Sequence, residues 1–135
     1  MNIAIRYYTR SGNTKKLADA VSETVGVPAL AVSQPLKERA DVLFLGCSYY
    51  AFDVDDAVKN FIMENRENIG KIVCFGTSAM MKSMKKPLGK VAQSVGVSLS
   101  EREFHCRGSF GVLHKSRPNA KDLAAVAEFA KNSIK

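Results

Sequence analysis

The six-residue stretch TRSGNT near the start of the chain combines small hydroxyl side chains with a glycine. Thr9, Ser11 and Thr14 each offer a rotatable hydroxyl, and Gly12 permits a tight backbone turn. The residues that follow have helical periodicity, and the first N–H groups of a helix lack intrahelical acceptors and carry partial positive charge. The stretch is therefore predicted to cradle an anion such as a phosphate. The alternative is plain helix capping by Ser11 or Asn13, in which no ligand binds.

The loop differs from the two best-known phosphate-binding motifs. The chain contains neither G-x-x-x-x-G-K-[ST] nor G-x-G-x-x-G. The prediction of phosphate binding therefore depends on the position of the loop, which lies between a first predicted strand and a first predicted helix.

Strands and helices are predicted to alternate along the whole chain. Apolar runs predict strands at residues 3–8, 29–32, 42–47, 72–75 and 99–106. Helical periodicity predicts helices at residues 14–25, 55–65, 87–95 (with a start near Lys82) and 120–134. This alternation predicts an α/β protein with parallel βαβ units, a three-layer sandwich with helices on both faces of the sheet. Ligands of such sheets bind beyond the carboxyl ends of the strands, at the switch point in strand order.

The overall composition predicts one domain that spans residues 1–135 and has a real core, since 46% of the residues are hydrophobic. No apolar run reaches membrane-spanning length, and the N-terminal segment lacks the features of a signal peptide. Cys47, Cys74 and Cys106 lie far apart in apolar segments without a C-x-x-C. We therefore expect buried thiols in a reducing, cytoplasmic environment, with neither disulfides nor a metal site.

The net charge of +7 is concentrated in the second half of the chain. Residues 1–70 hold 8 basic and 9 acidic residues, a net charge of −1, whereas residues 71–135 hold 12 and 4, a net charge of +8. Such a field can attract acidic proteins, nucleic acid or phosphorylated ligands, and it does not choose among them. A nucleic-acid role is disfavoured because the basic residues lack interleaved aromatic residues or a known docking element.

The order of these motifs resembles the flavodoxin family. The resemblance begins with NIAIRYY followed by TRSGNTKKLADAV, and extends through FLGCSYYAFDVDDAVKNFI, KIVCFGTSA and RPNAKDLAAVAEFAKN. It implies a flavodoxin-like fold with a five-stranded parallel sheet of order 2-1-3-4-5. It also implies that the first loop holds the phosphate of FMN.

Two further loops are candidates for the flavin ring. Tyr49, Tyr50 and Phe52 leave a predicted buried strand and could cover a flat ring by stacking, although one or two of them could instead pack under the loop. By resemblance, this loop flanks the isoalloxazine ring. In the third loop, Thr77 and Ser78 could hydrogen-bond the pyrimidine edge of the flavin. The predicted cofactor-binding residues are Thr9, Arg10, Ser11, Gly12, Asn13, Thr14, Ser48, Tyr49, Tyr50, Ala51, Phe52, Asp53, Thr77, Ser78, Ala79 and Met80.

The leading functional hypothesis is an FMN-binding electron-transfer protein that shuttles electrons between redox partner proteins, acidic ones among the candidates. An alternative is an FMN-dependent NAD(P)H oxidoreductase of a quinone-like small molecule, with lysines 82, 85, 86 and 90 holding a nicotinamide phosphate. These lysines could equally be a solvated helix face. A third reading is a binding module that kept the fold and lost flavin. No side chain is predicted to be catalytic.

Overall fold

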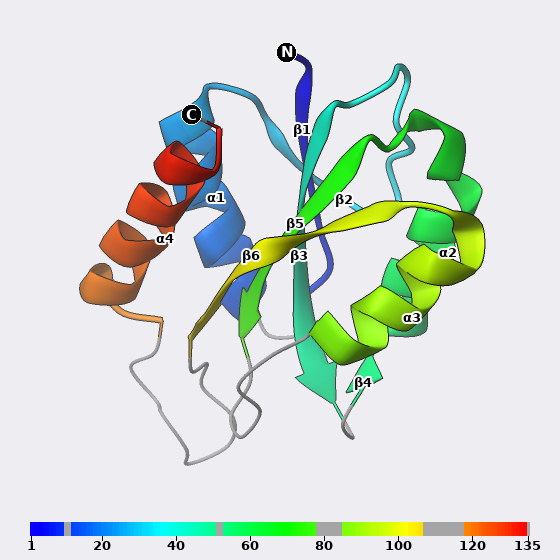
Figure 1. Cartoon of the computed structure of the whole chain (residues 1–135). Coiled ribbons are helices and arrows are strands. Elements are labelled where there is room, and N and C mark those ends of the chain that lie inside the picture. Colours follow the sequence, from blue (N-terminus) through cyan, green and yellow to red (C-terminus); the bar gives the residue numbers. More distant parts are fainter. Residues whose placement is uncertain (10–11, 51–52, 78–84, 107–117, 135) are drawn as a thin grey trace.

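The computed structural model describes residues 1–9, 12–50, 53–77, 85–106 and 118–134 (Figure 1). Five parallel strands form its sheet: β1 (Ile3–Tyr7), β2 (Ala29–Ala31), β3 (Val42–Tyr50), β5 (Lys71–Thr77) and β6 (Ser98–Cys106). Their spatial order is β2-β1-β3-β5-β6. Counted along the chain without the two-residue β4, this is the predicted order 2-1-3-4-5, which is therefore confirmed.

Helices cover both faces of the sheet, as predicted. The helices are α1 (Asn13–Val25), α2 (Asp56–Glu64), α3 (Lys85–Val95) and α4 (Ala120–Ser133), and a short 3-10 helix (Arg66–Asn68) follows α2. Figure 1 shows α1 beside α4 on one face and α2 beside α3 on the other. The sequence prediction omitted the 3-10 helix and placed the boundaries of α1, α2 and α4 within one residue. For α3 a start near Lys82 was predicted, and the described helix begins at Lys85.

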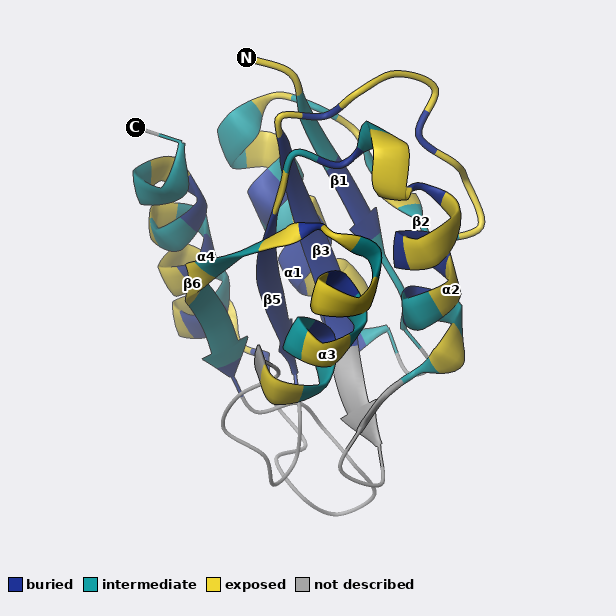
Figure 2. Ribbon diagram, turned by 45° about the vertical axis from the view of Figure 1, so that its right-hand side comes forward, coloured by how far each residue is buried: buried dark blue, intermediate teal, exposed yellow. Residues whose placement is uncertain are grey.

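The central strands are buried on both faces, which explains why they read as continuous apolar runs. In β3, Phe44 packs in the cluster beneath α1 and α4, whereas Leu43 and Leu45 pack beneath α2 and α3. Figure 2 shows the same burial in the neighbouring strand β5. The sheet is thus a rigid platform whose strand ends can hold a site.

The end of β3 differs from the prediction. Residues 48–50 were expected in a loop, but they continue β3, and Ser48 pairs with Thr77 of β5. β4 (Asp53–Val54) then runs antiparallel to the last two residues of β3. Tyrosine favours strands, and the hairpin pairs backbone groups that a loop would leave to solvent. The second candidate loop is therefore shorter than expected.

The edge strand β6 contains an irregularity that the sequence did not reveal. Ile72 of β5 pairs with Leu99 of β6, and the next pair along the strands joins Cys74 of β5 to Glu103 of β6. The chain advances two residues in β5 but four residues in β6 between these pairs. β6 therefore holds two extra residues at this point. Glu101 and Arg102 are exposed there, and a bulge with charged side chains discourages pairing with another sheet.

Candidate functional site

The site begins where the strand order reverses. β1 lies between β2 and β3, and the chain passes from the carboxyl end of β1 into α1. The crevice at such a switch point is the usual ligand site of an open parallel sheet. The described candidate residues from the first loop and from the ends of β3 and β5 meet at this edge, the lower edge of the sheet in Figure 1.

The start of α1 has the backbone of an anion cradle. Gly12 precedes the helix with φ +88°, a left-handed conformation that favours glycine, and a Cβ placed there would meet no atom within 4 Å. The Gly12 N–H donates to Thr9 Oγ1 at 2.9 Å, and the first helical bond runs from the Lys16 N–H to the Gly12 carbonyl at 3.2 Å. Among the described residues, no side-chain cap hydrogen bond is found for the N-cap position Gly12. The loop is thus folded tightly, with open space beside its glycine.

The charges in the first turn of α1 also favour an anion. This turn contains no acidic residue, although acidic side chains are the ones that stabilise a helix start. Instead Lys15 and Lys16 follow directly, and both are exposed. Lys15 Nζ lies 2.9 Å from Asp19 Oδ2, and this bond raises the pKa of Lys15. A bound phosphate would be stabilised by the positive end of the helix.

Three of the predicted residues are buried around this cradle. Asn13 and Thr14 are buried in the first turn of α1, and Thr77 is buried at the last position of β5. Thr14 Oγ1 lies 3.3 Å from Thr77 Oγ1, so the structure joins residues from two separately predicted loops.

The remaining predicted residues are described less fully. The backbone of Ser48, Tyr49 and Tyr50 lies at the end of β3, and that of Asp53 lies in β4. The other predicted residues lie outside the described ranges: Arg10, Ser11, Ala51, Phe52, Ser78, Ala79 and Met80. The described part of the candidate site is therefore its predicted phosphate end, together with the ends of β3 and β5 that precede the loops predicted to hold the ring.

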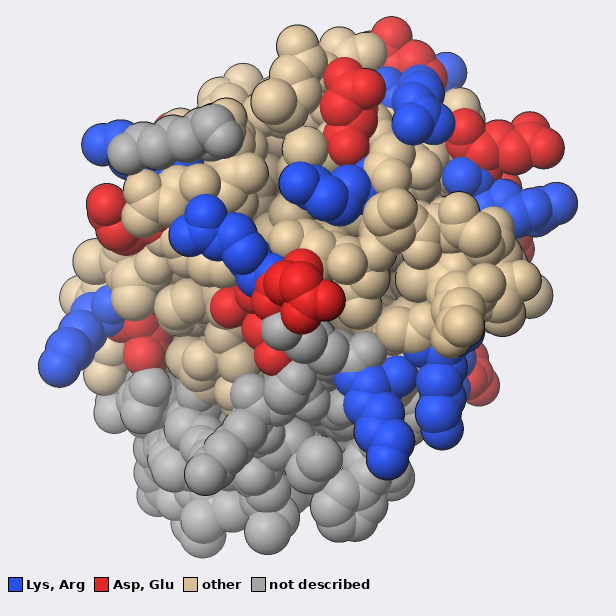
Figure 3. Space-filling model, in the orientation of Figure 1, with Lys and Arg blue, Asp and Glu red and all other residues tan. Residues whose placement is uncertain are grey.

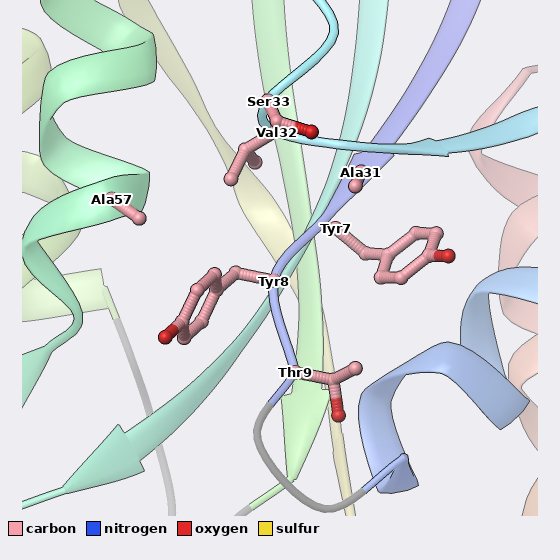
Figure 4. A pocket seen from close by; sticks show the side chains of 7 residues that line it. All are labelled: Tyr7, Tyr8, Thr9, Ala31, Val32, Ser33 and Ala57. Carbon is pink, nitrogen blue, oxygen red and sulfur yellow. The ribbon is translucent and has the colours of Figure 1, made fainter.

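A cavity of about 340 Å³ lies on the β2 side of the carboxyl end of β1, and the sequence did not indicate it. Tyr7 and Tyr8 point to opposite faces of the sheet beside it, and Thr9 is the one lining residue that it shares with the cradle (Figure 4). Its lining consists of Tyr7, Tyr8, Thr9, Ala31, Val32, Ser33 and Ala57. The two adjacent tyrosines at the end of a predicted strand are the sequence feature that could have indicated this cavity.

Cys47, Cys74 and Cys106 are all buried, as predicted, and none of these three forms a disulfide. Burial raises the pKa of the Cys47 thiol well above its usual value, and nearby Cys74 and Glu103 act in the same direction. The Cys74 thiol lies 3.5 Å from Glu103 Oε2 and can donate to it. Protonated, buried thiols are poor nucleophiles. Within the described ranges, no group of three or more His, Cys, Asp or Glu could hold a metal ion, and no helix is long and apolar enough to cross a membrane.

Sequence comparison finds no family model and no curated protein that matches the chain. Structure comparison does find matches. A flavodoxin from the domain Archaea superposes with a TM-score of 0.75 at 17% identity, covering 98% of this chain and 95% of that one. The fold is flavodoxin-like. This confirms the resemblance that the motif order suggested.

Two other matches show where such a fold occurs. A flavodiiron core from Synechocystis sp. matches with a TM-score of 0.75 at 15% identity, over 98% of this chain and 34% of that one. A flavoprotein from Lactobacillus acidophilus in complex with FMN matches with a TM-score of 0.65 at 15% identity, over 78% of this chain and 92% of that one. The flavodoxin-like fold thus occurs both as a whole chain and as part of a longer one.

The described residues of this flavodoxin-like chain fit a phosphate group at the start of α1. The helix start offers backbone N–H donors, Gly12 leaves room beside them, and no acidic side chain of the first turn opposes a negative charge. Thr9 Oγ1 lies beside the same point, 2.9 Å from the Gly12 nitrogen, and its hydroxyl can also donate.

Proposed function

We propose that the chain is an FMN-binding electron-transfer protein whose cofactor phosphate lies at the start of α1. The observation that carries the proposal is the cradle itself: a helix start with a left-handed Gly12, no side-chain cap and two lysines, at the switch point of a flavodoxin-like sheet. The FMN complex of the Lactobacillus acidophilus flavoprotein, which shares the fold, supports the choice of cofactor.

In this proposal FMN supplies the redox chemistry when bound, and the protein supplies binding and orientation. Backbone N–H groups at the start of α1 and the hydroxyl of Thr9 would hold the phosphate. The ends of β3 and β5 would direct the two ring loops toward the same edge of the sheet. The buried polar residues of the first turn would fix the helix start against the sheet and so set the distance between phosphate and ring loops.

The proposal is tested by the visible spectrum of the purified protein, before and after addition of FMN and removal of the excess. We expect a yellow protein with one FMN per chain, either as isolated or after reconstitution. The Asn119→Ala variant, which alters the start of a different helix, is the matched control and should take up the same amount. A colourless protein that fails to take up FMN would contradict the proposal and favour a module that has lost flavin.

The expected partners are redox proteins, and the charge near α3 favours acidic ones. α3 contains three lysines and no acidic residue, and Lys86 and Lys90 are exposed. Figure 3 shows basic side chains gathered at the lower right of the molecule, where α3 begins. Like-signed charges on one face steer an oppositely charged partner during encounter.

This partner preference is tested with Lys86→Gln and Lys90→Gln together, against Lys131→Gln near the end of α4 as a control. We expect the double variant to keep its FMN affinity and to react several-fold more slowly with an acidic redox protein at low salt, with the difference shrinking as salt screens the charges. Equal rates for all three proteins at every ionic strength would remove α3 from the docking face.

The second candidate function is an FMN-dependent NAD(P)H oxidoreductase of a quinone-like molecule, because the same lysines could hold a nicotinamide phosphate. Stopped-flow mixing of the FMN-loaded protein with NADPH alone separates the two functions. Rapid bleaching of the flavin would support the reductase, whereas bleaching only after a partner reductase is added would support the carrier.

A further inference from the structure

The cavity beside the carboxyl end of β1 has walls from three separate parts of the chain. Tyr7 and Tyr8 come from the end of β1, Val32 comes from the segment after β2, and Ala57 comes from the first turn of α2. Figure 4 shows the two tyrosine rings on opposite sides of the strand, with Ala57 on the side of Tyr8. The volume of about 340 Å³ is at the lower end of the range for small-molecule sites. The cavity therefore suits a small ligand, of about one or two rings.

Hydrogen bonds hold the wall that follows β2 in place. The Val32 N–H donates to the Tyr7 carbonyl at 2.9 Å, and the Gln34 N–H donates to the Ala31 carbonyl at 3.0 Å. Arg6, which is buried in β1, donates from Nε to the Gln34 carbonyl at 2.8 Å. Because these bonds fix the segment against β1, a ligand would bind without first having to order this wall.

The chemistry of the lining favours an uncharged aromatic ligand. None of the lining residues within the described ranges has a charged side chain. Tyr7 and Tyr8 are half-buried, and aromatic rings pack well on one another by offset stacking or edge to face. Their phenol groups and the hydroxyls of Thr9 and Ser33 can donate or accept hydrogen bonds. A charged ligand would lose hydration here without meeting an opposite charge in this lining.

The cavity is separate from the proposed phosphate cradle. It lies on the β2 side of β1, whereas the cradle lies at the start of α1. Thr9 borders both, and its Oγ1 accepts from the Gly12 N–H at 2.9 Å. Thr9 is thus part of the wall between the two places, and a ligand in the cavity leaves the cradle open to a phosphate.

We propose that this cavity is a second binding site, for an uncharged aromatic molecule of one or two rings that carries a hydroxyl or carbonyl group. The ligand packs against the ring of Tyr8 and fills the space beside Ala57. The site goes beyond the proposed electron-transfer function and does not depend on it, because no part of the cavity argument requires bound FMN.

The test uses 2-naphthol, an uncharged two-ring molecule with one hydroxyl. The chain contains no tryptophan, so 2-naphthol can be excited at wavelengths that tyrosine does not absorb, and its own emission reports binding. We expect saturable binding to one site per chain with a dissociation constant below about 1 mM, as for other ligands of this size. Naphthalene-2-sulfonate, which has the same rings and a negative charge, should bind at least about tenfold more weakly.

Two substitutions place the probe in the cavity. Ala57→Leu adds bulk from α2 while keeping a good helix former, and should weaken 2-naphthol binding at least about tenfold. Ala124→Leu adds the same atoms at an exposed position of α4 outside the cavity, and should bind 2-naphthol like the wild type. Tyr8→Phe keeps the ring and should keep binding, whereas Tyr8→Leu should weaken it about twofold to tenfold.

A competition experiment separates this site from the proposed cofactor site. Saturating FMN should leave the dissociation constant of 2-naphthol, measured by calorimetry, within about twofold of its value without FMN. Displacement of 2-naphthol by FMN would mean that one site takes both and would overturn the proposal. A protein that binds 2-naphthol but no FMN would support the cavity site and contradict the proposed function, so the two failures are distinguishable.

Three further results would overturn the proposal. Binding of 2-naphthol that does not saturate would mean that the cavity is not a site for this class of molecule. Binding that Ala57→Leu leaves unchanged would place the ligand elsewhere. Naphthalene-2-sulfonate that binds as tightly as 2-naphthol would show that the site does not select an uncharged ligand.

Discussion

The starts of α1 and α4 differ in how the unpaired N–H groups of a first helical turn are capped. At α4, Asn119 Oδ1 accepts from the Asp122 N–H at 3.0 Å, and Asp122 Oδ2 accepts from the Asn119 N–H at 2.9 Å. This is a complete capping box, with an acidic side chain at the positive end of the helix. At α1, Gly12 offers no cap and the first turn has no acidic residue. The start of α4 is thus capped by its own side chains, whereas the start of α1 has the features that we propose for an anion site.

The start of α2 agrees with that of α4. Asp55 caps α2 by accepting from the Ala57 N–H at 3.0 Å, and Asp56 adds an acidic residue in the first turn. The start of α1 therefore differs from those of α2 and α4, whereas the first turn of α3 also lacks an acidic residue. The contrast with α2 and α4 indicates that helix formation alone does not explain the polar residues at the start of α1.

The largest expected effect comes from placing a negative charge at the cradle. Gly12→Asp and Gly12→Asn have similar shapes, and both residues tolerate a left-handed backbone. We expect Gly12→Asp to bind FMN about 100-fold more weakly than Gly12→Asn, a difference of about 2.7 kcal/mol, because its carboxylate repels the phosphate. Fluorescence titration with FMN measures this. Equal affinities would break the contrast between α1 and α4.

The control for the backbone is Gly26→Asn. Gly26 ends α1 with φ +76°, and a Cβ there also meets no atom within 4 Å. It carries the same local conformation at the other end of the same helix. Its substitution should leave FMN affinity unchanged.

Filling the space at Gly46 is expected to have the next largest effect. Gly46→Ala forces its Cβ against Thr14 and Phe75, so we expect a loss of about 1–3 kcal/mol in the free energy of unfolding, the usual cost of overpacking. Gly89→Ala is the control, because its Cβ would meet only Leu99 Cδ2 at an ordinary 3.9 Å. Chemical denaturation measures both. A stable Gly46→Ala variant would show that α1 does not need this close approach.

Removing the cap of α4 should lower the free energy of unfolding without changing FMN affinity. Asn119→Ala loses the side-chain acceptor of the capping box, and we expect the free energy of unfolding to fall by about 1 kcal/mol. FMN affinity should stay the same because the cap belongs to a different helix from the one that bears the proposed cradle. If FMN affinity fell in parallel with stability, the roles assigned to the two helix starts would need to be revised.

The smallest expected effect has opposite signs in the two helices. Lys16 lies at the positive start of α1, whereas Lys131 lies in the last turn of α4, where a cation is favourable. In the ligand-free protein, Lys16→Gln should raise the free energy of unfolding and Lys131→Gln should lower it, each by about 0.3–1 kcal/mol at low salt. Denaturation at low and high salt measures both changes. Effects of the same sign would contradict the electrostatic account.

The strands of the sheet were predictable because strands buried on both faces form continuous apolar runs in the sequence. The runs that became β3 and β5 are apolar on both faces, and only a parallel sheet covered by helices buries strands in that way. Helical spacing of apolar residues gives a similar indication, since Val58, Phe61 and Ile62 recur at that spacing in α2 and are all buried.

Features set by tertiary contacts were not predictable. The Thr14–Thr77 contact joins residues 63 positions apart, and no local pattern reports it. The irregular register of β6 depends on how it pairs with β5 and has no local signature. Gly46 did carry a signal, since a glycine inside an apolar strand indicates a close approach, but its contact with α1 required the fold.

The most direct test of the account is the ratio of the dissociation constants of riboflavin and FMN for the wild-type protein, measured by flavin fluorescence. The two ligands differ by the phosphate, which the account places at the start of α1. Because charge-assisted hydrogen bonds contribute about 1.5–3 kcal/mol each, we predict that FMN binds about 100-fold more tightly or better. Equal affinities for the two ligands would contradict the assignment of a phosphate site to α1.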